Sequence, residues 1–280
     1  GARSVIQESV AVFCPVFTPA ADALVYVASR NTGGSEIRLQ PLEGHRPVGQ
    51  AEHLTETRET CANPSVSSDG AWIAFHAVAE GQRDIWIVPR QGGLAQRITQ
   101  HPGVDVMPRF SPEGEMLSFV SDRGGSEQVW VVPVDAGRPT GEPRQVTFGV
   151  HPAHHQTWSP DGRQMAHLVY KEAGELWLRD VGDGGEGRRL DVAVDVLDVR
   201  WDPASGDLFA LARWESEAPS LRAVSLDDGS IRPISRSQSV VPSGASVSWF
   251  DVSDDGSMFA FMVQERRGDV WLLAAERGTF

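Results

Sequence analysis

Cysteine, long hydrophobic runs and positive charge are all scarce in this chain of 280 residues. Its two cysteines, Cys14 and Cys61, cannot staple a domain of this size, and their spacing matches neither a zinc knuckle nor a redox CxxC motif. The longest apolar runs, 129–132 and 270–275, are far shorter than the roughly 18 residues of a transmembrane helix. We therefore expect a soluble protein with no membrane insertion.

Lys and Arg number 25 against 38 Asp and Glu, which gives the chain a formal net charge of −13. A surface of this sign repels phosphate backbones, and we expect no nucleic-acid partner. Hydrophobic residues make up 40% and charged residues 22% of the chain, a composition that excludes a disordered protein. The 28 glycines and 18 prolines follow no collagen-like period and predict many turns and few long helices.

A repeat with steps of 43 to 51 residues runs through the chain. Each copy holds a turn of the Ser-Pro-Asp-Gly kind between two short runs of β-branched and aromatic residues, followed by a third run and a short fourth run. The residue before each turn anchors its copy, and the six anchors are Phe17, Val66, Phe110, Trp158, Trp201 and Val252. This period is typical of one four-stranded blade. We predict an all-β fold, a single six-bladed β-propeller over residues 1–280 with four-stranded antiparallel blades.

The last copy ends after its third run, which leaves the six blades with only five outer strands after their anchors. The five outer segments are 52–55, 96–99, 144–147, 188–190 and 232–234. Residues 3–8 share their pattern of an arginine followed by apolar residues, but precede the first anchor. We predict that this N-terminal strand pairs into the last blade and closes the ring, which removes the open edges of a linear array.

The repeat, which reads PxFSPDGxxIAF…IWxxxxxGGxxRxxT, resembles that of the TolB-type six-bladed β-propeller family, a WD40-like (PD40) repeat. The resemblance covers nearly the whole chain and is strongest in the second, third and fourth copies. The first and fifth copies have residues 19–23 and 203–207 in place of the tight turn, which predicts irregular blades. Such propellers serve as periplasmic scaffolds, gating domains of serine peptidases, bacterial sensor domains and lyases, so the resemblance implies a fold and not one activity.

Motifs for nucleophilic catalysis and phosphate binding are missing from the sequence. No Gly-x-Ser-x-Gly elbow occurs, and six blades use the whole chain, which leaves no room for an appended hydrolase domain. The glycine pairs at 33–34, 92–93, 124–125 and 184–185 fall at blade loops, where glycine supplies turn geometry. The sequence therefore favours a protein that is not an enzyme and needs no cofactor.

A histidine cluster lies in the connection that enters the fourth blade. In a propeller these connections emerge at one mouth of the central channel, on the face opposite the Pro-Asp-Gly turns. Three residues before the anchors stand Cys14, Asn63, Met107, His155, Asp198 and Trp249, a polar and unequal set that we expect near the channel. The candidate binding residues are His151, His154, His155, Gln156 and Asp198, together with Trp214 and Trp249, which break the tryptophan pattern, and Asp105 from a charged loop.

The cluster resembles the metal-binding histidines of propeller lyases that cleave uronate oligosaccharides. A site of histidine, glutamine and aspartate could hold a divalent cation. The interpretation that we favour is neutral imidazoles hydrogen-bonded in a wet channel, without a metal. The metal-dependent polysaccharide lyase is kept as the alternative function.

We therefore expect a non-catalytic binding, interaction or sensor domain that recognises a protein or a small polar ligand at the channel mouth. The family resemblance implies a bacterial protein of the periplasm or the cell exterior, either a monomer or fused to other domains. Cys14 and Cys61 precede neighbouring anchors and should approach each other. In a secreted domain they could form a disulfide, provided that their Cα atoms come within roughly 7 Å.

Overall fold

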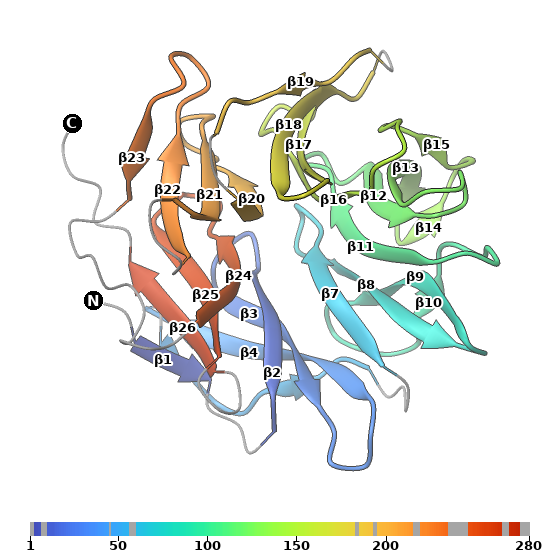
Figure 1. Cartoon of the computed structure of the whole chain (residues 1–280). Coiled ribbons are helices and arrows are strands. Elements are labelled where there is room, and N and C mark those ends of the chain that lie inside the picture. The colour runs from blue at the N-terminus through green and yellow to red at the C-terminus, as the bar shows by residue number, and fades with distance from the viewer. Residues whose placement is uncertain are drawn as a thin grey trace.

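The computed structural model describes residues 3–6, 10–44, 46–55, 60–182, 185–192, 195–214, 219–234, 246–264 and 269–274. Within these ranges the chain forms six antiparallel sheets and no helix. The sheets stand around a central axis as the blades of a propeller (Figure 1). The predicted all-β, six-bladed fold is confirmed.

The blades follow one another in chain order. Blade 1 contains β2 (Val12–Phe17), β3 (Ala23–Ser29), β4 (Ser35–Glu43), β5 (Arg46–Pro47) and β6 (Glu52–His53). Blade 2 contains β7 (Cys61–Val66), β8 (Trp72–Ala79), β9 (Gln82–Pro89) and β10 (Gln96–Arg97). Blade 3 contains β11 (Asp105–Phe110), β12 (Met116–Ser121), β13 (Gln128–Asp135), β14 (Arg138–Pro139) and β15 (Arg144–Gln145). Blade 4 contains β16 (Ala153–Trp158), β17 (Gln164–Tyr170), β18 (Gly174–Asp180) and β19 (Arg188–Arg189); blade 5 contains β20 (Asp195–Trp201), β21 (Leu208–Arg213), β22 (Ser220–Val224) and β23 (Ile231–Pro233); blade 6 contains β24 (Ser246–Val252), β25 (Met258–Gln264), β26 (Asp269–Ala274) and the N-terminal β1 (Arg3–Ile6).

The first long strand of each blade lies next to the axis, and these inner strands are β2, β7, β11, β16, β20 and β24 (Figure 1). Each inner strand contacts the inner strands of the two neighbouring blades, so together they form the wall of a channel. The remaining strands of a blade continue outward by antiparallel pairing. The side chains of the inner strands therefore decide what the channel can bind.

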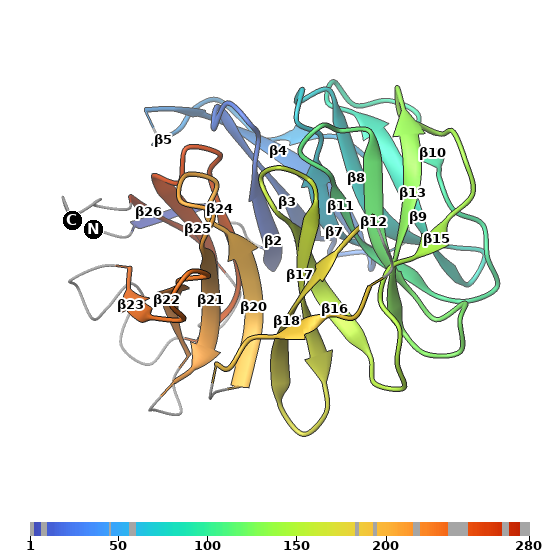
Figure 2. The same ribbon diagram turned by 90° about the horizontal axis from the view of Figure 1, so that it is seen from above.

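The first and last strands of the chain meet in blade 6, where β1 pairs antiparallel with β26 (Figures 1 and 2). In this pairing Arg3 lies opposite Leu272 and Ile6 opposite Val270. Ile6 is buried in a hydrophobic cluster that draws residues from blades 1 and 6, so the first and last blades pack together. The predicted pairing of the N-terminal strand is confirmed for residues 3–6, while residues 7 and 8 lie outside the described ranges.

A serine, an aspartate and a glycine shape the turn between the first two strands of a blade. In blade 4 the Ser159 hydroxyl donates to the Asp161 carboxylate at 2.6 Å and accepts the Gln164 N–H at 2.9 Å. Gly162 adopts φ +68°, a conformation that glycine enters without strain. Blades 2 and 6 repeat the arrangement. Blade 5 is irregular, as predicted. In its turn over 202–207 the Gly206 N–H donates to the carbonyl of Asp202, four residues earlier, whereas the turn glycines of blades 2, 4 and 6 donate to the carbonyl three residues earlier.

The hydrophobic core is divided among the contacts between blades. Within the described ranges, each pair of neighbouring blades encloses its own cluster of buried side chains. Two anchor tryptophans add hydrogen bonds across these contacts: Nε1 of Trp158 donates to the Arg109 carbonyl at 3.2 Å, and Nε1 of Trp201 donates to the Thr157 carbonyl at 3.1 Å. Neighbouring blades are therefore fixed to one another at the channel wall, since buried indole N–H groups hold their partners firmly.

Candidate binding sites along the central channel

A β-bulge interrupts each inner strand. It covers the third and second residues before the anchor in the first four blades, and the fourth residue before the anchor in blades 5 and 6. In the first four blades the residues at this position are Cys14, Asn63, Met107 and His155, all with φ between +52° and +55°. The next residue in the first three blades is Pro15, Pro64 or Pro108, which fits a bulge because proline has no N–H to offer the strand ladder. The first four predicted channel residues thus share one backbone feature, whereas Asp198 and Trp249 directly follow the bulges of their strands.

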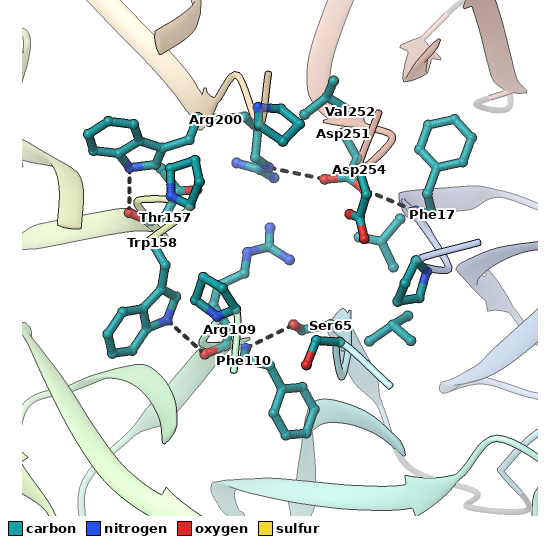
Figure 3. A pocket seen from close by; sticks show the side chains of 18 of the residues that line it. Phe17, Ser65, Arg109, Phe110, Thr157, Trp158, Arg200, Asp251, Val252 and Asp254 are labelled. Carbon is teal, nitrogen blue, oxygen red and sulfur yellow. Dashed lines mark hydrogen bonds and ion pairs between the residues drawn. The ribbon is translucent and has the colours of Figure 1, made fainter. Parts of the chain in front are cut away.

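A second ring, formed by the residues directly before the anchors, lines a cavity of about 390 Å³ (Figure 3). Its members are Val16, Ser65, Arg109, Thr157, Arg200 and Asp251. The rim of the cavity includes the turn residues Pro19, Ser68, Pro112, Pro160, Pro203 and Asp254. We call this end of the channel the turn face, and the end where the inner strands begin the histidine face, after His151, His154 and His155. The cavity volume falls in the range of small-ligand sites.

Hydrogen bonds and ion pairs connect charged side chains without interruption from blade 4 to blade 6. The Nδ1 atom of His155 lies 3.1 Å from Oδ1 of Asp198, and Nη1 of Arg200 donates to the same oxygen at 2.7 Å. Nε of Arg200 then donates to Oδ1 of Asp251 at 3.3 Å, while Oδ2 of Asp251 accepts the Phe17 N–H of blade 1 at 2.9 Å. Asp198 is 0% and Arg200 5% exposed. Buried charges of this kind require one another, so they hold the channel geometry in place.

The same contacts shift several pKa values. Burial alone would raise the pKa of Asp198, but the Arg200 charge and the His155 hydrogen bond together lower it to about 2. Burial lowers the pKa of Arg109 to about 10, and the neighbouring Arg200 charge acts in the same direction. Burial raises the pKa of Asp251, although both arginines oppose the change. Asp198 therefore stays ionised and Arg109 stays cationic at neutral pH.

Trp249, predicted as part of the contact surface, lies within the channel and is only 7% exposed. The guanidinium carbons of Arg200 and Arg109 lie 5.0 and 5.1 Å from its ring centroid, and the His155 ring centroid lies 6.0 Å away. The indole thus contacts the arginines of the cavity as well as a histidine of the opposite face. A partner could reach Trp249 only from inside the channel.

His154 and His155 pair with different carboxylates. The Nε2 atom of His154 lies 2.9 Å from Oε2 of Glu127, whereas His155 bonds Asp198. Both imidazoles pack near Tyr170, at centroid distances of 5.5 and 6.2 Å. Burial lowers the pKa of His154, against the influence of Glu127. No group of three or more His, Cys, Asp or Glu in the described part of the chain is arranged to hold a metal ion. These residues therefore do not fit a histidine-rich cation site.

The remaining predicted residues of the histidine face have varied surroundings. His151 is exposed just before β16. Gln156 is buried, and its amide donates to the Met107 carbonyl while its Oε1 has no partner among the described residues. Trp214 is half-buried, and its Nε1 donates to the Ser220 carbonyl at 2.8 Å. Only His151 and part of Trp214 thus present surface beside the partly exposed His154 and His155.

Sequence reasoning misplaced one residue and overlooked three. The placement of Asp105 in a charged loop is wrong: it begins β11, is fully buried and binds Arg123 at 2.6 Å, because the guanidinium neutralises its charge inside the blade. Arg109, Arg200 and Asp251 were overlooked, although all three stand directly before an anchor. Charged residues at a repeated inner-strand position were the signal that could have identified them.

The disulfide considered from the sequence is not formed, since Cys14 and Cys61 are both free thiols. The Asn63 amide lies 3.7 Å from Sγ of Cys14, and the Ser35 hydroxyl lies 3.7 Å from Sγ of Cys61. Burial raises the pKa of each thiol to about 11. Both groups therefore stay protonated and weakly nucleophilic at neutral pH.

Comparison with known proteins agrees with this architecture. A family model described as the TolB beta propeller domain matches residues 1–178. A search of curated proteins gives no match. Within the described residues no helix is long and apolar enough to cross a membrane.

Several solved structures share the fold. TolB from Acinetobacter baumannii is 22% identical, with a TM-score of 0.65 over 95% of this chain and 58% of that one, so the chain spans less than two thirds of its length. An oligogalacturonate lyase in complex with manganese is 14% identical, with a TM-score of 0.66 over 97% and 79% of the two chains. A puromycin-hydrolyzing peptidase of Mycobacterium tuberculosis is 15% identical, with a TM-score of 0.64 over 99% and 45%. At these identities the likeness concerns the fold alone.

Proposed function

Because the chain belongs to the TolB β-propeller family, we propose that it is a non-catalytic binding module whose partner, a protein or a small polar ligand, docks on the histidine face. The observation that carries this proposal is the way His154 and His155 are held. Each imidazole is partly exposed and bonded to a carboxylate, and both pack near Tyr170. Polar groups fixed in this way lose little conformational freedom when a partner binds, which favours recognition.

The candidate residues divide into two groups under this proposal. His151, His154, His155 and Trp214 would touch the partner, because each has exposed surface. Asp198, Gln156, Trp249 and Asp105 are buried and would act by positioning the others. Tryptophan side chains at such surfaces often contribute most of the binding energy, whereas charges at the rim contribute little.

The alternative function is a metal-dependent polysaccharide lyase. It rests on the shared fold with oligogalacturonate lyase and on the histidine cluster of blade 4. No group of three or more His, Cys, Asp or Glu among the described residues is placed to hold a metal ion, and this weighs against the lyase. The pairing of His154 with Glu127 and of His155 with Asp198 does not, because each imidazole keeps a second ring nitrogen. We therefore rank the binding module first.

Location and context belong to the same proposal. Family membership supports a bacterial protein of the periplasm or the cell exterior, and the coverage of only 58% of one TolB chain supports fusion to further domains. A monomer without further domains is the alternative to such a fusion.

Two measurements test the proposal. A partner captured from a bacterial periplasmic extract should protect residues 151–156 and the end of β21 from hydrogen exchange, and Trp214→Ala should weaken its binding by at least about tenfold. The matched control is Arg163→Gln, an exposed residue at the opposite face. Protection confined to the turn face or to the outer strands would overturn the proposal. Formation of unsaturated oligogalacturonate products in the presence of Mn²⁺ would favour the lyase.

A further inference from the structure

Two arginines of the inner strands point into the cavity of the turn face (Figure 3). Arg109 comes from blade 3 and Arg200 from blade 5, and both guanidinium groups lie about 5 Å from the centroid of the same Trp249 ring. Like charges that face one aromatic ring repel each other. Asp198 and Asp251 account for the cation at Arg200, but no ion pair among the described residues accounts for the one at Arg109. Their common orientation is explained if an anion binds between them.

The hydrogen-bonding capacity of the two arginines is only partly used. Arg109 donates to the Pro64 carbonyl at 3.0 Å, and no carboxylate of the described residues lies within ion-pair distance of it. Arg200 is buried and bonds Asp198 and Asp251, yet its Nη2 has no partner among the described residues. A buried guanidinium N–H without a partner is costly. An acceptor bound in the cavity would satisfy the unpaired N–H groups of Arg109 and Arg200.

The acidic residues of the same cavity limit the charge of that acceptor. Asp251 lies in the wall and Asp254 at the rim (Figure 3). Both carboxylates repel a multiply charged ligand such as phosphate, while one negative charge placed between the arginines avoids most of this repulsion. A planar carboxylate also matches the fork geometry of guanidinium donors.

We propose that the cavity of the turn face is a binding site for a single carboxylate group, held by Arg109 and by Nη2 of Arg200 beside Trp249. The carboxylate belongs either to a small organic acid or to the C-terminus of a polypeptide that enters the channel. The site opens at the opposite end of the channel from the surface of the proposed partner and does not require that partner, although Trp249 and the Arg200–Asp198 pair link it to His155.

The probes are acetate, inorganic phosphate, N-acetyl-trialanine with a free C-terminal carboxylate, and the C-terminal amide of the same peptide. Binding is measured by isothermal titration, and the indole N–H resonance of Trp249, assigned with Trp249→Phe, reports the location. We expect the peptide acid to bind at least about tenfold more tightly than its amide, since only the acid accepts charged hydrogen bonds from both arginines. Acetate binding as tightly as the peptide acid would identify a small acid as the ligand, and clearly weaker binding would identify a chain terminus.

Variants distinguish binding at this site from a general attraction between the peptide acid and positive charge on the protein. Arg109→Gln removes the arginine that has no ion pair among the described residues and should lower the affinity for the peptide acid at least about tenfold. Arg109→Lys should restore part of that affinity. Arg163→Gln removes one positive charge from the same face outside the cavity and should leave the affinity unchanged. Equal affinity for acid and amide, tighter binding of inorganic phosphate, or full affinity in a folded Arg109→Gln variant would each overturn the proposal.

Discussion

Replacing Asp198 by asparagine should destabilise the protein in a way that depends on pH. The carboxylate is fully buried and accepts hydrogen bonds from Arg200 Nη1 at 2.7 Å and from the Val199 N–H at 3.0 Å, beside His155 at 3.1 Å. Its pKa falls from the usual 3.8 to about 2. At 1.36 kcal/mol per pKa unit, this preference for the ionised form contributes about 2 kcal/mol of stability at neutral pH.

The sign of the pH dependence follows from the lowered pKa. The stabilisation is present above the unfolded-state value near 3.8 and is lost as the pH falls towards 2. Asp198→Asn also leaves Arg200 with Asp251 as its one remaining carboxylate, and an underpaired buried charge adds to the cost. We expect a loss of about 2 to 4 kcal/mol at pH 7, which shrinks by about 1 kcal/mol between pH 5 and pH 3.

Urea unfolding followed by tryptophan fluorescence at pH 7, 5 and 3 measures this difference. Asp135→Asn is the matched control, since Asp135 is exposed at the end of β13 and its replacement should cost under about 0.5 kcal/mol. If Asp198→Asn is as stable as the control variant, or if its deficit is the same at every pH, the ionised network across the channel does not stabilise the fold.

Three further predictions concern the ring, the thiols and the histidine face. Deleting residues 1–8 removes β1 and its buried Ile6 from blade 6, and calorimetry should show a melting temperature lower by about 5 °C or more; an unchanged value would contradict the role of β1. Cys14 and Cys61 should react slowly with a thiol reagent at pH 7 in the folded protein and yield two thiols after unfolding without reductant, because burial raises each pKa to about 11; fewer than two would indicate a disulfide. Trp214→Ala should keep the circular dichroism spectrum of the parent but bind the captured partner more weakly, and equal binding would remove Trp214 from the contact surface.

The blades were predictable because their turns are local. A serine that bonds its own turn and a glycine at positive φ recur in the second, third, fourth and sixth copies, whatever lies elsewhere in the chain. The pairing of β1 with β26 was also predictable, since one outer strand was missing at the end of the chain and one was left over at its start. The number of strands and the residues of the turns were together sufficient to predict a closed ring of six blades.

The contacts of the site were not predictable, because they join residues that meet only in the closed ring. His155 and Asp198 are 43 residues apart, and Arg200 and Asp251 are 51 apart. Trp249 was expected near the channel and as part of the contact surface, but its burial against Arg109 and Arg200 from two other blades was not predictable. Periodicity indicates which strand holds a residue, but not which side chain from a distant blade it faces.

The repeated bulge makes the side chains that line the channel of this protein easy to exchange by mutation. Cysteine, asparagine, methionine and histidine occupy the same backbone conformation in four successive blades, with φ values that agree within a few degrees. A left-handed residue other than glycine or asparagine costs roughly 1 to 2 kcal/mol, so the fold already tolerates this cost at Cys14, Met107 and His155. A combinatorial library that varies these positions together would change the chemistry presented inside the channel while the blades around it stay the same. Propellers with new ligand preferences could be selected from such a library without redesign of a single strand.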